Sequence, residues 1–348
     1  MSDLLIRTEG CAGRITLNRP EALNAITYDM VRGIEAALQG WRGDAGVAIV
    51  VIDAAGARAF SSGGDIAEMY ASGRRGDLEY GRRFWRDEYR MNAKLHEYPK
   101  PVVSFLHGFT MGGGVGVGCH AQHRIVGESA QVAMPECGIG LVPDVGGSLI
   151  LANAPGHAGE YLALTAARMG PADAIHAGFA DRFVPEARWS ALKAELCQTG
   201  NWKRIADAAE TPPEGTLAAA RAEIDRLFAG ASLGEIAETL RVDGGGFAAD
   251  ALKRLSRNAP LSMACALAMI RRLRGTASIR RALALEYRFT HRAMQEGDFL
   301  EGIRAAIIER DRNPKWRHTG PEAVPDADVE SMLAPLGAAE LNLEKELA

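Results

Sequence analysis

Two carboxyl residues eight positions apart are the part of this sequence best suited to chemistry. Glu136 and Asp144 each follow a proline, in a segment otherwise made of apolar residues and glycine. A carboxylate in such surroundings is costly unless it is paired or used, so the segment indicates a shaped cleft. Burial and mutual repulsion would raise at least one pKa, which suits acid–base or nucleophilic work on a carbonyl compound. A helix cap at Glu136 and a turn residue at Asp144 explain the pattern equally well.

Two glycine-rich loops upstream could supply the other half of such a site. The run Gly112–Gly114 stands where a helix can begin, and its N–H groups would face a ligand with no side chain in the way. The loop Ala59–Ile66 contains Gly64. If the N–H groups of Gly64 and Gly113 faced one point, they would form an oxyanion hole for an acyl carbonyl. In the same loop Asp65 is placed to cap the following helix, and an ordinary capped turn is the alternative interpretation.

Composition excludes several classes of protein. The chain has 348 residues, 47% hydrophobic and 24% charged, with a net charge of −4, so it can bury a sizeable core but offers no long basic run. We therefore expect neither nucleic acid nor an anionic membrane as a partner. The five cysteines form no C-x-x-C pair, which favours a reducing compartment. Neither a signal peptide nor an apolar run of about 18 residues is present, and we expect a soluble cytoplasmic protein.

Three other motifs lead to weaker hypotheses. Gly116, Gly118 and Ala121 loosely match a dinucleotide fingerprint, but the preceding strand ends too early for that use. The histidines, of which His120 and His123 are three apart, lack a third ligand, so we expect no metal site. No G-x-S-x-G elbow surrounds any serine, which disfavours a serine hydrolase.

The pattern of apolar residues predicts an α/β fold. Two short strands are expected within 4–17, and a helix with the cap Thr27 follows. A continuous apolar run rich in β-branched residues at 47–52, and a similar run at 102–106, predict strands covered on both faces. Helices dominate beyond residue 155, and we expect the polar, proline-interrupted C-terminal end to pack loosely. We divide the chain into a catalytic core, 1–200, and a mainly helical C-terminal region, 201–348.

At three places the sequence resembles the crotonase (enoyl-CoA hydratase/isomerase) superfamily. The matching segments are Asn18–Ala25, Ala59–Ile66 and Gly112–Gly114. The resemblance implies a spiral of ββα turns with a C-terminal helical region, an acyl-CoA substrate, no separate cofactor, and a homo-oligomer. It also implies an oxyanion hole from the backbone of Gly64 and Gly113. By the same resemblance, the coenzyme A site is lined by Ala22, Leu23, Gly63, Asp65 and Ile66.

The glutamate pattern separates branches of that superfamily. Hydratases carry one glutamate just after the glycine run and another in a later Pro-Glu motif; here the first position is Gly116 and the second is Glu136. Asp144 stands where many hydratases have glycine. These features are similar to the 3-hydroxyisobutyryl-CoA hydrolase branch, as are the segments Phe84–Tyr89, Asp298–Ala305 and Asn313–Trp316. In that branch the glutamate at Glu88 lies in the substrate pocket. Departures occur at Ser61–Ser62, at Cys137–Gly138 and within 197–245.

The sequence thus predicts hydrolysis of a short 3-hydroxyacyl-CoA thioester, foremost 3-hydroxyisobutyryl-CoA, in valine breakdown. Gly64 and Gly113 would hold the thioester oxygen, Glu136 would act as nucleophile or as base toward water, and Asp144 would hold the 3-hydroxyl group. Glu88 would complete the polar end of the pocket. Two alternatives keep the fold: an enoyl-CoA hydratase or isomerase, and a non-catalytic acyl-CoA-binding protein.

Overall fold

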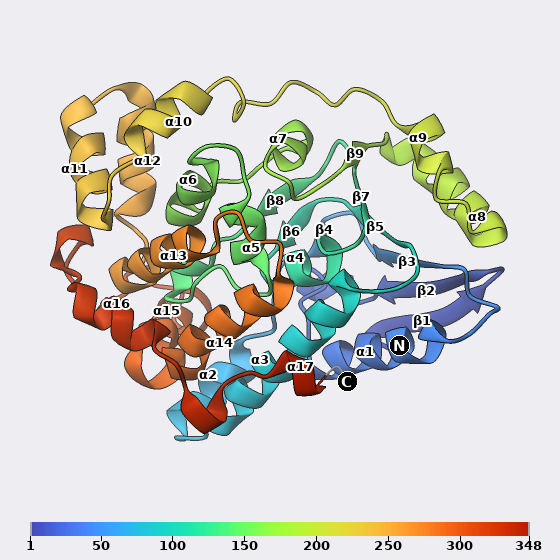
Figure 1. The fold of residues 1–348 in the computed structure, drawn as a ribbon, viewed down its shortest axis with the longest axis horizontal. Coiled ribbons are helices and arrows are strands. Elements are labelled where there is room, and N and C mark those ends of the chain that lie inside the picture. The colour runs from blue at the N-terminus through green and yellow to red at the C-terminus, as the bar shows by residue number, and fades with distance from the viewer. Residues whose placement is uncertain (1, 347–348) are drawn as a thin grey trace.

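Two sheets form the frame of the molecule in the computed structural model, which describes residues 2–346 (Figure 1). The larger sheet has the strand order β1-β2-β3-β5-β7-β9, and the smaller has the order β4-β6-β8. Strands β1 and β2 are antiparallel, and all other neighbours are parallel. The strand bounds are β1 Leu4–Glu9, β2 Ala12–Leu17, β3 Ile49–Ala54, β4 Ala59–Ser61, β5 Val102–Leu106, β6 Phe109–Met111, β7 His123–Val126, β8 Gln131–Ala133 and β9 Arg182–Phe183.

The chain climbs as a spiral, because each turn gives one strand to each sheet. The pairs β3–β4, β5–β6 and β7–β8 follow one another, and helices connect the turns. This confirms the predicted ββα spiral. The connecting and flanking helices of this half are α1 Tyr28–Arg42, α2 Ala67–Arg74, α3 Leu78–His96, α4 Gly113–Gly118, α5 Gly147–Ala152, α6 Ala158–Thr165, α7 Pro171–His176 and α8 Trp189–Thr199.

Strand β3 shows why the uninterrupted apolar run folds as it does. Val50 and Ile52 face the main core, whereas Ile49 and Val51 belong to a second cluster that includes Trp189 of α8. Both faces of the strand are therefore covered, as expected for a central parallel strand. The strand begins two residues later than predicted, at Ile49.

Helix α3 carries polar side chains on its buried face. Its neighbour α1 begins at the predicted cap, where Thr27 Oγ1 accepts the N–H of Met30 at 3.2 Å. Arg90 of α3 binds Glu35 of α1 through two nitrogen–oxygen contacts of 2.6 and 2.8 Å. These bonds fix the outer face of α3, and the opposite face buries Glu88 and other residues toward the interior.

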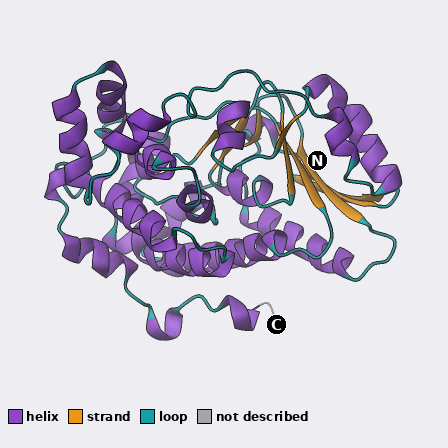
Figure 2. Cartoon of the chain, turned by 45° about the horizontal axis from the view of Figure 1, so that its top comes forward, coloured by secondary structure: helices purple, strands orange, loops and turns teal. Residues whose placement is uncertain are grey.

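Helices α10 to α16 gather to one side of the sheets (Figure 1 and Figure 2), whereas α9 packs beside α8. Helix α14 packs along α3, and α13 packs on α5 and α6. No helix among residues 2–346 is long and apolar enough to cross a membrane. The helix bounds are α9 Arg204–Ala208, α10 Arg221–Leu227, α11 Leu233–Asp243, α12 Gly246–Leu255, α13 Pro260–Leu273, α14 Ile279–Glu296, α15 Phe299–Ile303, α16 Asp326–Leu333 and α17 Leu343–Glu346.

The C-terminal end packs more closely than expected. Met332 and Leu333 at the end of α16 are buried, and so are Leu341 and Leu343. Loose packing was predicted from the prolines and polar residues, but a few apolar residues between them are enough to fix this part of the chain. The predicted boundary at residue 200 falls at Gly200, which ends α8, and the division into two regions stays a prediction.

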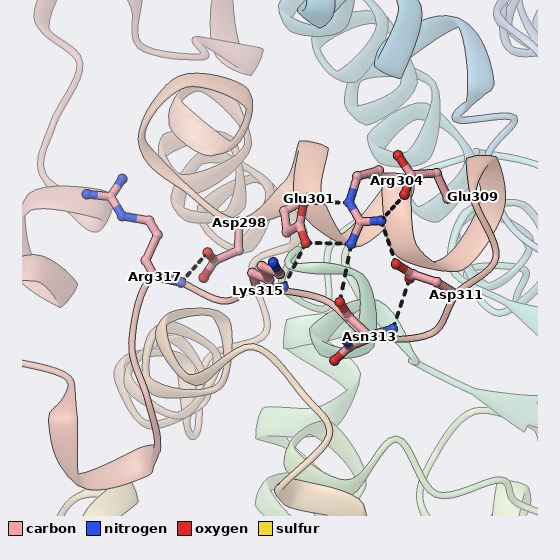
Figure 3. A network of polar contacts seen from close by, with 8 residues as sticks. All are labelled: Asp298, Glu301, Arg304, Glu309, Asp311, Asn313, Lys315 and Arg317. Atoms are coloured by element: carbon pink, nitrogen blue, oxygen red, sulfur yellow. Dashed lines mark hydrogen bonds and ion pairs between the residues drawn. The ribbon is translucent and has the colours of Figure 1, made fainter.

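After α15, a segment is held together by one arginine (Figure 3). A short π-helix, Arg304–Ile308, continues α15. Arg304 binds Glu301 Oε1 at 2.8 Å, Asp311 Oδ2 at 2.8 Å and the carbonyl oxygen of Asn313 at 3.2 Å, and it also contacts Glu309. Figure 3 shows these groups converging on a single guanidinium. The contacts of Arg304 therefore close residues 304–313 into a loop.

We expect Arg304→Ala to loosen residues 304–313 while the rest of the fold stays intact, because several partners would lose their shared cation. Hydrogen–deuterium exchange should rise in this segment and remain unchanged in the sheets. Arg241→Ala is the matched control, since it removes an arginine that bridges Glu238 and Glu322 on the surface. Equal exchange in the segment for wild type and Arg304→Ala would contradict the assignment.

Candidate active site

The two glycine loops meet at one edge of the smaller sheet. Strands β4 and β6 are parallel neighbours, so the loops that follow them lie side by side. A Cβ atom on Gly113 would lie 3.2 Å from the amide nitrogen of Gly64. Gly63 and Gly112 have positive φ angles, 113° and 48°, which glycine adopts most easily. The two glycines that the sequence suggested as a pair, Gly64 and Gly113, thus lie close together.

The amides of that space are suited to receive an oxygen. Gly113 is the first residue of α4, so its N–H has no acceptor within its own helix. On either side of Gly64, the N–H of Gly63 donates to Ser61 Oγ and that of Asp65 donates to the carbonyl oxygen of Ile26. The backbone of Gly64 and Gly113 therefore lies together at one side of the cleft, where the predicted oxyanion hole would require it.

Glu136 comes from the third strand of the same sheet. It begins a 3-10 turn, Glu136–Ile139, shortly after β8, whose C-terminal end lies beside that of β6. Its side chain is buried, and Oε1 lies 2.8 Å from the position that a Cβ atom on Gly112 would take. Three adjacent parallel strands therefore deliver the glycine loops and the glutamate to one place. Any side chain at Gly112 would displace the carboxyl group.

Asp144 and Glu88 close the site from the other side. Asp144 lies in the turn before α5, and its Oδ2 accepts a hydrogen bond of 2.7 Å from Tyr89. Glu88 reaches in from α3, with Oε1 3.1 Å from the position of a Cβ atom on Gly113. Both carboxyl groups are buried. The cleft thus holds three carboxyl groups beside the backbone of Gly64 and Gly113, and their catalytic roles stay a prediction.

Burial controls the ionisation of these carboxyl groups. Desolvation, followed by the charge of Asp144, raises the pKa of Glu88 and of Glu136 well above their ordinary value. Desolvation raises the pKa of Asp144 to about 7, while hydrogen bonds from Tyr89 and from its own backbone oppose the rise. Within residues 2–346, Glu88 Oε1 and Glu136 Oε2 are buried with no hydrogen-bond partner. Such atoms are costly unless a bound molecule satisfies them.

All of the residues predicted to bind substrate line one cleft of about 510 Å³. Ile307, from the loop closed by Arg304, also lines this cleft. The predicted residues on its wall are Ala22, Leu23, Gly63, Gly64, Asp65, Ile66, Glu88, Gly113, Glu136 and Asp144.

Asp65 differs from its prediction in one respect. Helix α2 begins after Ile66, and no side chain caps it. Asp65 instead binds the guanidinium of Arg19 at 3.1 Å. The prediction of a helix cap was therefore wrong, because an arginine distant in sequence competes for this carboxylate. The ion pair connects Asp65 of the cleft wall to Arg19, which precedes the lining residues Ala22 and Leu23.

Sequence reasoning missed the apolar wall of the cleft. Phe84, Trp85 and Phe299 line it, and the rings of Trp85 and Phe299 pack with centroids 5.5 Å apart. Both segments were recognised as family motifs, but only Glu88 received a role. The signal was present in the aromatic residues of those motifs. Their meeting could not be read, because α3 and α15 lie more than two hundred residues apart.

The space around Gly116 explains one departure from hydratases. A Cβ atom there would lie 2.7 Å from Asn92 Nδ2 and 2.8 Å from Val145 Cβ. A glutamate at this position would collide with both residues. Among residues 2–346, no group of three or more His, Cys, Asp or Glu side chains is arranged so that it could hold a metal ion.

Comparison with known proteins places the fold and site in a family. The model of the enoyl-CoA hydratase/isomerase family matches residues 12–333. The chain belongs to this family. A relative named 3-hydroxyisobutyryl-CoA hydrolase, mitochondrial, from Xenopus laevis is 36% identical and aligns with 97% of this chain and 90% of its own length.

Two solved structures share nearly the whole fold of this family member. An enoyl-CoA hydratase from Rhodobacter sphaeroides 2.4.1 is 57% identical, with a TM-score of 0.94 over 98% of this chain and 100% of that one. A carnitinyl-CoA dehydratase from Mycobacterium thermoresistibile is 39% identical, with a TM-score of 0.94 over 99% of each chain. The fold is therefore shared by proteins that carry different activity names.

We expect Gly113→Ala to lower turnover by up to about 10²–10³-fold, the usual effect of losing an oxyanion donor, because its methyl group displaces the neighbouring Gly64 amide even though residue 113 keeps its own N–H. The added methyl group would press on Glu88 Oε1 and on the Gly64 amide. Steady-state kinetics on an acyl-CoA thioester measures the loss. Gly40→Ala is the control, because a Cβ atom there meets nothing within 4 Å. Equal activity of the two variants would remove Gly113 from the site.

Proposed function

We propose that this protein hydrolyses the thioester of a short 3-hydroxyacyl-CoA, foremost 3-hydroxyisobutyryl-CoA, as a step in valine breakdown. The observation that carries the proposal is the convergence of Glu136 and Asp144 on the amides of Gly64 and Gly113 in one cleft. Relatives named 3-hydroxyisobutyryl-CoA hydrolase, 34–37% identical over nearly the full length, support the same substrate.

The first step is attack on the thioester carbonyl carbon. Gly64 and Gly113 would donate to its oxygen as negative charge develops there, an interaction stronger in the transition state than in the substrate. Glu136 is the carboxyl group closest to Gly112, which precedes Gly113 in the glycine loop. It either attacks the carbon directly or removes a proton from the attacking water.

The two routes differ in the bond that Glu136 makes. Direct attack forms a mixed anhydride, breaks the carbon–sulfur bond and releases the thiolate of coenzyme A; water then cleaves the anhydride. In the other route water adds to the carbon, and the same sulfur leaves. Many turnovers in ¹⁸O-labelled water separate the two routes, because label in Glu136 requires the anhydride, whereas attack by water on the thioester labels the product alone.

Asp144 and Glu88 would bind the polar end of the acyl group. We propose that Asp144 accepts the hydrogen bond of the 3-hydroxyl group and that Glu88, whose pKa is raised by burial, is protonated beside it. Phe84, Trp85 and Phe299 would enclose the apolar part of the chain. The buried oxygen of Glu88 that lacks a partner would then gain one from the substrate.

We expect Glu136→Gln to lower turnover by about 10²–10⁴-fold while acyl-CoA still binds, because the amide can neither attack nor take a proton. Free-thiol release and calorimetric binding measure the two effects separately. Glu68→Gln is the control, since Glu68 is an exposed carboxylate of α2. Near-normal turnover of Glu136→Gln would overturn the proposed mechanism.

The rate should depend on pH through the carboxyl groups of the site. Because burial raises the pKa of Asp144 to about 7, this group protonates as pH falls through neutrality, and burial also raises the pKa of Glu136 above its ordinary value. Their reactive form is the carboxylate, so we expect kcat/KM to fall on the acid side and to level off above neutral pH. A flat profile across neutrality, measured in buffers of constant ionic strength, would contradict this expectation.

A hydratase is the second candidate function. The 57% identical structure named enoyl-CoA hydratase favours it, and so does the presence of two glutamates, Glu88 and Glu136, in the cleft. Against it, Gly116 has no room for the first hydratase glutamate. Thiol release from 3-hydroxyisobutyryl-, 3-hydroxypropionyl-, acetyl- and isobutyryl-CoA, together with hydration of crotonyl-CoA, distinguishes the two. Binding without either reaction would indicate an acyl-CoA-binding protein.

The remaining expectations are also proposals. We propose a homo-oligomer in the cytoplasm that acts without a separate cofactor or metal. Light scattering would give the number of subunits, and metal analysis of the active protein would test whether it acts without a metal. Both measurements are independent of the substrate.

A further inference from the structure

Tyr89 is the residue that contacts Asp144 most directly. Its phenol O–H donates to Asp144 Oδ2 at 2.7 Å, and both side chains are buried. Tyr89 follows Glu88 in α3, so one turn of this helix reaches both Asp144 and the glycine loops. No role was predicted for Tyr89 from the sequence, although it closes the motif that contains Glu88.

The hydrogen bond from Tyr89 gives Asp144 and Glu88 different tendencies to ionise. Asp144 has a donor on Oδ2, whereas Glu88 Oε1 is buried and has no partner among residues 2–346. A hydrogen bond to the charged form favours ionisation, and burial without one disfavours it. Two carboxyl groups so close together cannot both ionise easily, so a difference of this kind decides which one keeps the proton.

The phenol is itself held in place. The ring of Tyr89 packs edge-on against Tyr287 of α14, with centroids 6.3 Å apart. The preceding residue of α14, Glu286, accepts the N–H groups of Gly146 and Ser148 at 2.8 and 3.2 Å, which fixes the turn just after Asp144. Helix α14 therefore supports both partners of the hydrogen bond, the donor through packing and the acceptor through its backbone.

We propose that Tyr89 is a positioning residue for Asp144: its O–H fixes the carboxylate and makes Asp144, rather than Glu88, the anionic member of the pair. The proposal rests on the proposed function in assigning Asp144 to the substrate's hydroxyl group. A fixed anion would accept that hydroxyl, while a protonated Glu88 could donate to the substrate. Tyr89 would act through Asp144 and need not touch the substrate.

The ionisable groups around Asp144 determine whether loss of the Tyr89 hydrogen bond raises or lowers the pKa of Asp144. Glu88 faces it from α3, Glu136 from the turn after β8, and Glu286 from α14; all three have pKa values raised chiefly by burial. His120, which binds the carbonyl oxygen of Val145, has a pKa lowered to about 3 by burial and is neutral. No cation is therefore among these neighbours, and loss of the Tyr89 hydrogen bond should raise the pKa of Asp144.

The direct test is a carboxyl titration of the whole protein without substrate. Carbon-13 NMR of protein labelled at the aspartate carboxyl carbons follows Asp144, with Asp144→Asn identifying its signal. We expect Tyr89→Phe to move the Asp144 midpoint upward from the wild-type value. Tyr287→Phe is the matched control, because it removes the hydroxyl group of a neighbouring buried tyrosine that binds Arg86 instead. An unchanged midpoint in Tyr89→Phe would overturn the proposal.

Kinetics provides a second readout. Tyr89→Phe should lower kcat/KM at neutral pH by about ten- to a hundredfold, the worth of a hydrogen bond to a charged group. The acid limb of its pH profile should move to higher pH, so that activity partly recovers in alkaline buffer. An equal loss at every pH would mean a purely structural role and would also overturn the proposal. Failure of the wild type to release thiol would defeat the proposed function. The NMR titration would still test whether Tyr89 controls the ionisation of Asp144.

Discussion

The need to bury several acidic groups beside bare backbone amides governs the rest of the molecule. Glu88, Glu136 and Asp144 would each prefer water, and the fold keeps them in a cleft where their oxygens have few partners. Such a site persists only when the surrounding structure is stable enough to hold it. The parallel strands β4, β6 and β8 provide that support. Tyr89 and Glu286 add hydrogen bonds to Asp144 and to the turn that follows it.

Much of the frame could be predicted from local sequence. The runs that form β3 and β5 are mostly apolar because both faces of these strands are covered, and Thr27 caps α1 as its residue type indicates. The pair Glu136 and Asp144 could also be predicted, since acidic residues are otherwise out of place between prolines and glycines. These features depend on neighbours in the chain, which a sequence displays directly.

What escaped prediction depends on residues far apart in the chain. Asp65 caps no helix because Arg19 binds it, and the aromatic wall forms only when α3 meets α15. Tyr89 was hidden for the same reason, because its partner Asp144 is 55 residues away. Local propensity gives no information on such pairings, whereas a family resemblance does so only for positions whose role is already known.

The support that α14 gives to the turn after Asp144 bears on how the chain can be divided. Every group proposed to react lies before residue 145, yet Glu286 holds Gly146 and Ser148, and Phe299 walls the cleft. A fragment ending at residue 200 would contain the whole chemical set and leave its shape undefined. The two regions therefore differ in composition but depend on each other for function. The C-terminal helices give the active site its shape, and the first region supplies the groups proposed to react.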